Sequence, residues 1–435
     1  MKAGYKQTEI GVIPDDWDAL PIGSSTEFKN GLNKAKAFFG YGTPIVNYMD
    51  VFKHFGMNRS DIAGLVSVTT DEQSAYSARK GDVFFTRTSE TVDEIGVSAV
   101  LLEDVEKAVF SGFILRGRDK AGTEGFHLDF KKYCFSSEPV RKQIRSSASY
   151  TTRALTNGNL LAKVLVPTPR DPDEQKAIAG ALSDVDGLIA GLEALIAKKC
   201  SLKTATMQQL LTGKTRLTGF GEGVGMKQTE LGELPEDWDV VALGSLGVWK
   251  GGGTPSMQNP LFWDNGKIPW LSSGEIKEPE ISGSKMMITS KAVEASSTII
   301  VPVGSIITVM RSGILRKYFP VSTNTVPVAI NQDLKTLIPN DDQCGEFIFH
   351  SLWHENSRIL ANCVKTGTTV ESVEFKWLKA FNIAMPREPI EQREIAVVLN
   401  DQDNEVLHLS GKLSKAKALK QGMMQELLTG RTRLI

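Results

Sequence analysis

The sequence has few cysteines, no long apolar run and no excess of charge of one sign. Only four of its 435 residues are cysteines, and no two of them are spaced as a CxxC motif. This excludes a small disulfide framework and a thiolate metal site of the common spacing. The four, which we interpret as reduced thiols, are Cys134, Cys200, Cys344 and Cys363.

Apolar runs are short. The richest stretch, residues 298–310, is interrupted by Pro302 and Gly304 and falls below the roughly 20 residues that a membrane-spanning helix needs. The N-terminal residues lack the apolar core of a secretory signal. We therefore expect a cytoplasmic protein with no membrane segment.

Positive and negative side chains are nearly balanced. The chain has 50 Lys and Arg against 51 Asp and Glu, a formal net charge of −1. A globally basic nucleic-acid binder is thus excluded, so any nucleic-acid surface must be a local patch. A chain of this length is expected to form about two to four domains.

Motifs for catalysis and cofactor binding are incomplete. "TGKT" at 212–215 has Gln208 where a phosphate-binding loop needs glycine, and it follows a helical pattern rather than a strand. "NPLF" at 259–262 is similar to the base-holding motif of amino-methyltransferases, but Leu261 replaces its second proline and no adenosylmethionine loop accompanies it. We therefore predict no catalytic residue, no metal ligand and no cofactor held by this chain.

A long segment occurs twice. Residues 173–217, "DEQKAIAGALSDVDGLIAGLEALIAKKCSLKTATMQQLLTGKTRL", align without a gap on residues 390–434, so that Glu174 matches Glu391. Apolar residues alternate in steps of four and three, which is typical of a coiled-coil seam. The predicted seam residues are Ile178, Leu182, Val185, Ile189, Leu192 and Ile196, then Ile395, Leu399, Val406, Leu409 and Leu413. We expect two long helices that pair with each other, antiparallel.

Signals at both ends delimit these helices. Asp171 can cap the first helix, Pro172 suits its first position, and Gly213 and Gly430 mark the two C-terminal ends. About 40 residues of helix would span roughly 60 Å at 1.5 Å per residue.

A second repeat precedes each globular half. "KQTEIGVIPDDWDALPIGS" at 6–24 matches "KQTELGELPEDWDVVALGS" at 227–245. The interiors between the repeats diverge, are rich in short β-branched runs, and each end in a helical pattern. The predicted fold is α+β, with two globular domains separated by two long helices in a pseudo-two-fold arrangement. The predicted segments are 1–170 and 226–387 (domains), 171–217 and 388–435 (helices) and 218–225 (linker).

Basic residues of the two domains are the candidates for a nucleic-acid surface. "GDVFFTR" at 81–87 and "GSIITVMR" at 304–311 each follow a turn glycine with a β-rich run and an arginine. An arginine at a strand end can place its guanidinium against a phosphate or a guanine edge. Hydroxyl and amide groups in "SYTTRALTNGN" and "KTGTTVES" suit the same contacts. The predicted DNA-binding residues are Arg87, Arg141, Arg153, Arg311, Arg316, Lys365 and Thr368.

The doubled order of these motifs resembles the specificity subunit of type I restriction-modification systems. The paired "P[DE]DW" segments, the paired "EQ…LLTG[KR]TRL" helices and the fragment "GGGTPSMQNPLFWDNGKIPWLSSGEI" carry the resemblance, which covers essentially the whole chain.

The resemblance implies a non-catalytic subunit that binds double-stranded DNA. Each globular domain would read one half of a split, asymmetric site, and the helices would set the spacing and dock two methylation subunits. Those partners would carry S-adenosylmethionine, and restriction subunits would join them.

Three alternatives stay open. The chain could serve a methylation-only system without a restriction subunit. It could be a coiled-coil protein scaffold that binds no DNA. A self-contained modification enzyme would need the adenosylmethionine loop and base-holding motif that the sequence lacks.

Overall fold

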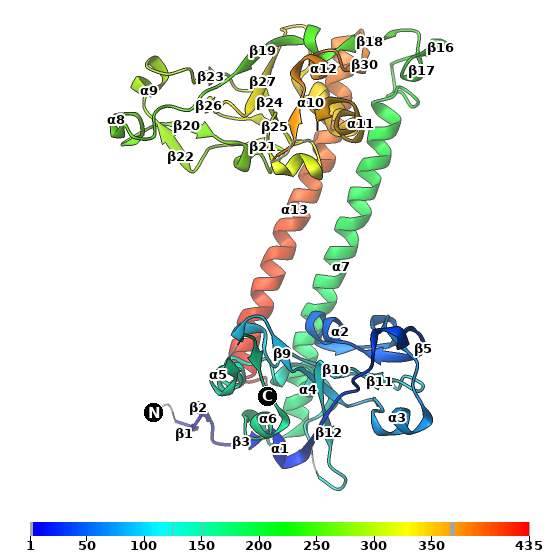
Figure 1. Ribbon diagram of the computed structural model, residues 1–435, viewed down its shortest axis with the longest axis vertical. Coiled ribbons are helices and arrows are strands. Elements are labelled where there is room, and N and C mark those ends of the chain that lie inside the picture. Colours follow the sequence, from blue (N-terminus) through cyan, green and yellow to red (C-terminus); the bar gives the residue numbers. More distant parts are fainter. Residues whose placement is uncertain (1–2, 124, 151, 366–369, 435) are drawn as a thin grey trace. The chain divides into compact units, whose positions relative to one another are not determined.

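The computed structural model describes residues 3–123, 125–150, 152–365 and 370–434. The chain forms two compact units. Unit 1 comprises Met1–Glu193 with Gly411–Ile435, and unit 2 comprises Ala194–Ser410. Each unit therefore contains one β-rich domain and a segment of both long helices (Figure 1). The predicted fold class is confirmed: α+β, with two β-rich domains and two long helices in contact. The five-segment division stays a prediction, because the units divide the helices near their middles.

The long helices begin and end where the sequence signals place them. Helix α7 spans Pro172–Leu210 and α13 spans Pro389–Leu427, 39 residues each. The Asp171 carboxylate accepts a hydrogen bond from the Asp173 backbone N–H at 2.9 Å, as expected of a cap. After the helices, Gly213 and Gly430 have φ of 67° and 69°, a conformation that favours glycine. Among the described residues, no helix is both apolar enough and long enough to span a bilayer.

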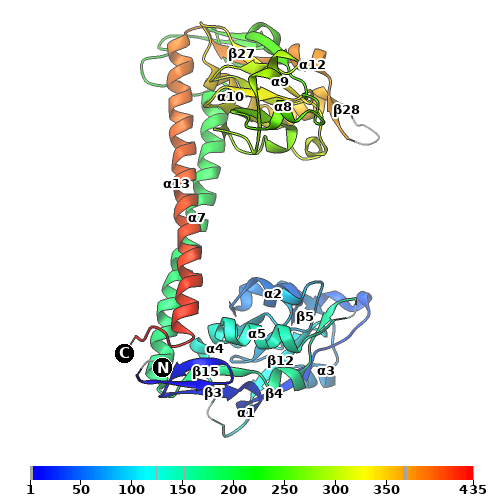
Figure 2. The ribbon, with the colours of Figure 1, turned by 90° about the vertical axis from the view of Figure 1, so that its left-hand side faces the viewer.

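Within each unit the two helices lie side by side and run antiparallel (Figures 1 and 2). In unit 1, Lys420 pairs with Asp186 at 2.6 Å and Lys417 with Glu193 at 2.7 Å. Residues later in α7 thus contact residues earlier in α13, which shows that the two helices run antiparallel. Unit 2 repeats this order, because Lys199 pairs with Glu405 at 2.7 Å and Lys203 with Asp403.

Most predicted seam residues are better shielded from solvent than their neighbours on the helices. Ile178 and Leu182 belong to the apolar core of the unit 1 domain, and Ile395 and Leu399 to that of unit 2. The start of each helix therefore packs against a domain as well as against the other helix. Val185 and Leu409 are also buried, and the half-buried seam residues are Ile189, Leu192, Ile196, Val406 and Leu413.

The unit 1 domain is built on a five-stranded sheet of order β4-β12-β8-β10-β6. All neighbours are antiparallel except β10 and β6, which are parallel. A second sheet has the order β11-β5-β7. The strands are β4 Thr26–Asn30, β5 Phe39–Val46, β6 Gly56–Met57, β7 Leu65–Val66, β8 Val83–Thr86, β10 Ser98–Leu101, β11 Val109–Phe110 and β12 Ile114–Asp119.

The unit 2 domain repeats this topology although its sequence diverges. Its five-stranded sheet has the order β19-β27-β24-β25-β21, with the same antiparallel pairs and a parallel pair at the β21 edge. A four-stranded sheet, β22-β20-β26-β23, accompanies it. The strands are β19 Gly247–Gly251, β20 Ile268–Leu271, β21 Glu280–Ile281, β22 Met286–Ile288, β23 Ile300–Val301, β24 Ile306–Val309, β25 Val321–Asn324, β26 Val328–Ile330 and β27 Leu334–Pro339.

Short hairpins and helices complete both domains. Two-stranded pairs join the start of each domain to the strand before its long helix: β3 with β15 and β18 with β30. These strands are β3 Trp17–Pro21, β15 Leu165–Pro169, β18 Trp238–Ala242 and β30 Asn382–Pro386, after the hairpins β1 Tyr5–Thr8 with β2 Gly11–Pro14 and β16 Met226–Thr229 with β17 Gly232–Pro235. The helices used below are α2 Tyr48–Lys53, α3 Thr70–Ala75, α4 Leu128–Cys134, α5 Glu138–Ser147, α8 Pro260–Trp263, α10 Gly345–His354 and α11 Asn356–Cys363.

In each unit, an arginine that follows one long helix binds a glutamate at the start of the other; we call it the closing arginine. In unit 1, Arg433, beyond the end of α13, binds the carboxylates of Asp16 and Glu174 and lies 5.9 Å from the centroid of the Trp17 ring. Glu174 is almost fully buried and also accepts from the Trp17 indole N–H at 2.9 Å. The Arg433 guanidinium holds the pKa of Asp16 below its usual value.

Unit 2 repeats the contacts of the arginine. Arg216, beyond the end of α7, binds the carboxylates of Asp237 and Glu391 and lies 5.7 Å from the Trp238 ring centroid. This closure explains why the sequence repeats "TRL" after both helices. In each unit, an arginine that follows one helix neutralises a buried glutamate at the start of the other.

Removing the closing arginine of unit 1 should destabilise that unit. Arg433→Ala leaves the Glu174 carboxylate buried without its charged partner, and we expect a loss of about 3 kcal/mol in the free energy of unfolding of unit 1. Arg431→Ala is the matched control. The Arg431 side chain is 67% exposed, and its ion pair with Glu426 is long at 3.8 Å. Its expected effect is within about 0.5 kcal/mol. Native-state hydrogen exchange of unit 1 peptides measures both, and equal effects would contradict the account.

The junction of domain and helix differs between the units. In unit 1, Tyr133 of α4 donates to Asp186 at 2.6 Å. The matching residue of unit 2 is His350 of α10, whose Nε2 lies 2.8 Å from the Asn400 amide oxygen. His350 is fully buried and its Nδ1 has no partner within the described residues. Burial lowers the pKa of His350 below its ordinary value of about 6.5.

Unit 2 should therefore lose stability as the pH falls below about 6.5. In that range the unfolded chain takes up a proton at His350, whereas the folded chain resists protonation, so the free energy of unfolding decreases. His350→Tyr with Asn400→Ser copies the unit 1 pair of Tyr133 and Ser183 and should reduce this slope. Asn400→Ser alone keeps the histidine and is the control. Urea unfolding between pH 5 and 7.5 measures the slope, and an unchanged slope in the double variant would refute the prediction.

Candidate nucleic-acid interface

Arg87 and Arg311 occupy matching places in the two domains. Strands β8 and β24 are the central strands of their five-stranded sheets, and each is buried along its length. Arg87 follows β8 directly, and Arg311 follows β24 after Met310. Arg87 is half-buried and Arg311 exposed. We call Arg87 and Arg311 the strand-end arginines. The sequence alignment matched them to each other, and the order of the strands in the two sheets places them at equivalent positions.

In unit 1 the strand-end arginine lies beside a late hairpin. The Arg87 backbone N–H donates to the Phe113 carbonyl at 3.1 Å, and its carbonyl accepts from Thr156 at 3.0 Å. Next along the chain, β9 (Thr88–Ser89) pairs with β14 (Ala154–Leu155), which pairs with β13 (Ser149–Tyr150). Arg153 precedes β14 and is exposed. Two predicted residues 66 positions apart in sequence, from 87 to 153, therefore lie on neighbouring segments.

A cavity of about 360 Å³ opens beside this hairpin, and we call it the hairpin cavity. Arg153 and Phe113 line it, and Phe113 is 62% exposed. The Glu94 carboxylate on its wall already accepts from the Ser89 hydroxyl at 2.9 Å. The full lining is Tyr48, Met49, Phe52, Thr88, Ser89, Glu90, Glu94, Phe113 and Arg153. A guanidinium beside exposed apolar surface is a combination that contacts phosphates, base edges and thymine methyl groups.

Unit 2 presents the same arrangement with other side chains. Arg311 forms an isolated bridge with Ser372, and Met310 accepts from the Val373 N–H at 2.8 Å. Ser372 and Val373 form β29, which pairs with β28 (Val364–Lys365). The predicted residue Thr368 lies outside the described residues.

Two further predicted residues of unit 2 belong to the same region and carry ion pairs. Arg316 donates to Glu371 at 2.6 Å, and its guanidinium holds the pKa of Glu371 below the usual value. Lys365 pairs with Glu374 at 2.6 Å and lies 4.7 Å from the centroid of the Trp377 ring. Arg316 and Lys365 remain 59% and 52% exposed, so both can still meet an anion.

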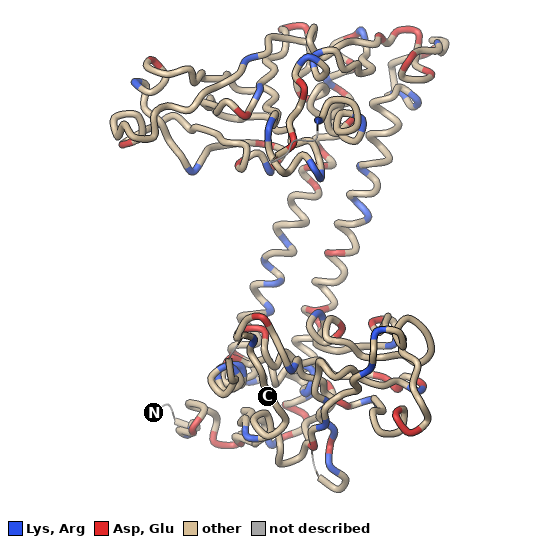
Figure 3. Tube along the Cα trace, in the orientation of Figure 1, with Lys and Arg blue, Asp and Glu red and all other residues tan. Residues whose placement is uncertain are grey.

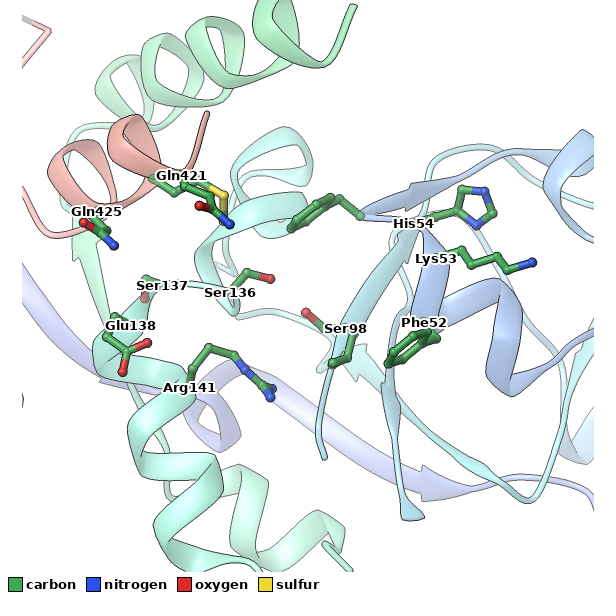
Figure 4. A pocket seen from close by; sticks show the side chains of 13 residues that line it. Phe52, Lys53, His54, Ser98, Ser136, Ser137, Glu138, Arg141, Gln421 and Gln425 are labelled. Atoms are coloured by element: carbon green, nitrogen blue, oxygen red, sulfur yellow. The ribbon is translucent and has the colours of Figure 1, made fainter. Parts of the chain in front are cut away.

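Arg141 lies elsewhere. It projects from α5 beside a cavity of about 470 Å³ that Phe52, Ser98 and Gln421 also line (Figure 4). Its side chain is buried, and its Nη2 donates to the Asp93 carbonyl at 2.8 Å. Burial lowers the pKa of Arg141 to about 10. A DNA contact by Arg141 stays a prediction, and its burial favours the strand-end residues over it.

Several other basic side chains of unit 1 are engaged in structural ion pairs. Arg118 binds Asp82 through two nitrogens, at 2.7 and 2.6 Å, and Lys131 pairs with Asp119 at 2.7 Å. Figure 3 shows basic and acidic positions interspersed along both domains. Charge count alone therefore does not locate a nucleic-acid interface.

Sequence reasoning missed the aromatic part of the candidate interface. Tyr150 of β13 is 59% exposed, and Trp377 near Lys365 is 45% exposed. Tyr150 stands within the "SYTTR" motif, which was selected only for its hydroxyl groups and its arginine. An aromatic residue between polar neighbours at a turn was the available signal, because aromatic side chains are costly to expose without a partner.

Comparison with known proteins identifies relatives of the chain. The family described as "Type I restriction modification DNA specificity domain" matches residues 235–417. The type I restriction enzyme EcoR124I/EcoR124II specificity subunit of Escherichia coli is 33% identical over 236 residues, 54% of each chain. The putative type I restriction enzyme MjaX specificity subunit of Methanocaldococcus jannaschii is 25% identical over 446 residues, 99% of this chain and 97% of the relative.

Solved structures share the fold. The type I restriction-modification S subunit from M. genitalium has a TM-score of 0.56 and 14% identity, and covers 94% of this chain and 96% of its own. A chain from a study of complex assembly and conformational transition of the type I R-M system has a TM-score of 0.55 and 15% identity, with 97% and 99% covered.

The match to the Escherichia coli relative spans about half the length of that protein, whereas the match to the MjaX subunit is nearly end to end. The two solved structures agree with the α+β fold of the chain. The chain is thus similar to the specificity subunits of type I restriction-modification systems.

Proposed function

We propose that this chain is the DNA-specificity subunit of a type I restriction-modification complex. Each globular domain reads one half of a bipartite, asymmetric site in double-stranded DNA. One observation supports the proposal above all. In both units a strand-end arginine lies beside a hairpin near the end of the domain, β13–β14 in unit 1 and β28–β29 in unit 2, but the surrounding side chains differ. Around it stand Phe113 and Arg153 in unit 1, and Arg316 and Lys365 in unit 2. Different surroundings favour different half-sites.

The partners follow from the family and from the internal repeat. Two methylation subunits dock on the paired helices, since a repeated chain offers each of them an equivalent surface. Those subunits hold S-adenosylmethionine and methylate adenine, and restriction subunits join them. The chain itself is non-catalytic in this proposal and acts in the cytoplasm. Among the described residues, no group of three or more His, Cys, Asp or Glu side chains forms a metal site.

Phosphate contacts must be shared with the partners. The net charge of −1 gives the isolated subunit little general attraction to DNA. Partner subunits then supply much of the phosphate contact, while the strand-end residues supply base discrimination.

Replacing either strand-end arginine should impair one half of the site only. In the complex with the methylation subunit, Arg87→Ala is expected to weaken binding of DNA with the cognate half-site of unit 1 by about 5- to 100-fold. Arg311→Ala should do the same for the other half. Fluorescence anisotropy with duplexes altered in one half at a time measures the effect.

Arg170→Ala and Arg387→Ala are the controls, because these arginines occupy repeated positions outside the interface. They bind Asp18 and Asp239, each at 2.7 Å, and are 58% and 55% exposed. Their loss should leave the discrimination of both half-sites unchanged. A uniform loss of affinity across unrelated DNA in Arg87→Ala and Arg311→Ala would reduce these residues to phosphate contacts and contradict the proposed reading role.

A further inference from the structure

Unit 1 exposes a cluster of aromatic side chains that the strand-end site does not use. Residues 35–42, "AKAFFGYG", are all exposed, and we call this segment the aromatic finger. Phe38, Phe39 and Tyr41 are 43%, 38% and 55% exposed. Three exposed rings within four residues are a local excess of exposed apolar side chains, which indicates a binding partner.

The backbone holds the finger in a bulge. In the pairing of β5 with β7, both Phe39 and Thr43 lie opposite Val66, so Gly40, Tyr41 and Gly42 loop out of the strand. Both glycines have positive φ, 102° and 96°. A side chain at Gly42 would also meet the Val66 carbonyl oxygen at 2.8 Å. The bulge therefore requires glycine on both sides of the exposed Tyr41. Bulges of this kind often change the direction of a side chain at a functional site.

Hydrogen bonds and an ion pair attach the base of the finger to the rest of the domain. The Phe38 carbonyl accepts from the Ser67 N–H at 2.8 Å. Lys34 donates to the Ser67 carbonyl at 2.8 Å, pairs with Glu72 of α3 at 2.6 Å and lies 4.7 Å from the Phe38 ring centroid. The exposed rings are therefore presented from an ordered base.

The charge around the finger favours a polyanion. Residues 28–49 contain three lysines and no Asp or Glu. Among the described residues, Lys36 within the finger forms no ion pair. Glu72 of α3 is engaged by Lys34 and by the Thr69 N–H. Exposed rings interleaved with unpaired lysine match a nucleic acid, which offers base and sugar faces beside phosphates.

In the described part of unit 2 this bulge is absent. Its equivalent pair, β20 with β22, runs in regular register from Ile268 opposite Ile288 to Trp270 opposite Met286. The preceding segment of unit 2 forms the short helix α8 instead of a bulge. The finger is therefore a difference between the two domains, as expected of an element that helps two half-sites to differ.

We infer that the aromatic finger is a second DNA-contacting element of unit 1, in which Tyr41 and the flanking phenylalanines pack against sugar or base surfaces and Lys36 contacts a phosphate. The inference rests on the proposed function. Strand β5 leads from the finger to α2, whose Tyr48 and Met49 line the hairpin cavity. The four residues of β5 after the bulge, from Thr43 to Val46, span about 13 Å, which corresponds to roughly four base pairs.

Photocrosslinking tests the contact directly. The full complex with the methylation subunit is irradiated on a duplex that carries its site, with thymines replaced one at a time by 5-iododeoxyuridine. Trypsin releases residues 37–53 as one peptide, and fragmentation separates crosslinks at 38–41 from crosslinks at 48–52. We expect crosslinks at 38–41 from positions at one side of the unit 1 half-site. Crosslinks confined to other segments would overturn the inference.

Affinity measurements complete the test. Tyr41→Ala should weaken binding of site-containing DNA by about 5- to 100-fold, and Tyr41→Phe, which keeps the ring, should restore it. Lys36→Gln should weaken binding of any duplex and reduce the salt slope by about one. Since these side chains are exposed, melting should not change.

Two outcomes separate this inference from the proposed function. If the unaltered complex discriminates its site but Tyr41→Ala has no effect on binding, the finger is not a DNA contact. If Tyr41→Ala instead weakens assembly with the methylation subunit, the finger docks protein and the inference also fails. A wild-type complex that shows no preference for any duplex contradicts the proposed function itself.

Discussion

The structure depends on a buried carboxylate at the start of each long helix. Glu174 and Glu391 have side chains that are 1% and 2% exposed, and each is neutralised by an arginine that follows the other helix. A buried carboxylate without a partner is strongly unfavourable, so each unit is complete only when both helices reach it. Because the same contact occurs in both units, the antiparallel order of the helices is set at two independent places. The domains are thereby attached to helix segments of fixed register.

The two domains share the topology of their main sheet but differ in the side chains on their surfaces. The five-stranded sheets share one order and one pattern of pairing, and in both an arginine follows the central strand. What differs is what stands beside it: Phe113, Arg153 and the aromatic finger in unit 1, and the ion-paired Arg316 and Lys365 in unit 2. A buried sheet tolerates few changes, whereas exposed hairpins and bulges can change without loss of stability. Such a division suits a protein that must read two unlike sequences with one fold.

Much of the architecture could be predicted from the sequence. Gapless repetition and heptad spacing predicted both helices, and Asp171, Gly213 and Gly430 predicted their ends. The alignment of Arg87 with Arg311 also anticipated their matching places in the sheets. The sheet order could not be predicted, because strand pairing joins segments far apart in sequence and the domain interiors diverge.

Residue environments were harder to predict. Arg141 was grouped with surface arginines, since nothing in its local sequence shows that α5 turns it inward beside Asp93. Tyr41 was overlooked, because "FFGYG" has the composition of a buried strand and only the shared partner Val66 shows the bulge. The repeated "TRL" motifs were visible in the sequence, but their role could not be predicted without knowing which glutamate each arginine contacts. Such contacts depend on long-range packing rather than on local pattern.

The central claim is that the two domains read the two halves of one split DNA site. The most direct measurement co-expresses the chain with its methylation subunit and maps methylated adenines across the genome by single-molecule sequencing. The account predicts one bipartite motif with two unlike halves and a fixed gap. An assembled, adenosylmethionine-bound complex that leaves no such motif would contradict it.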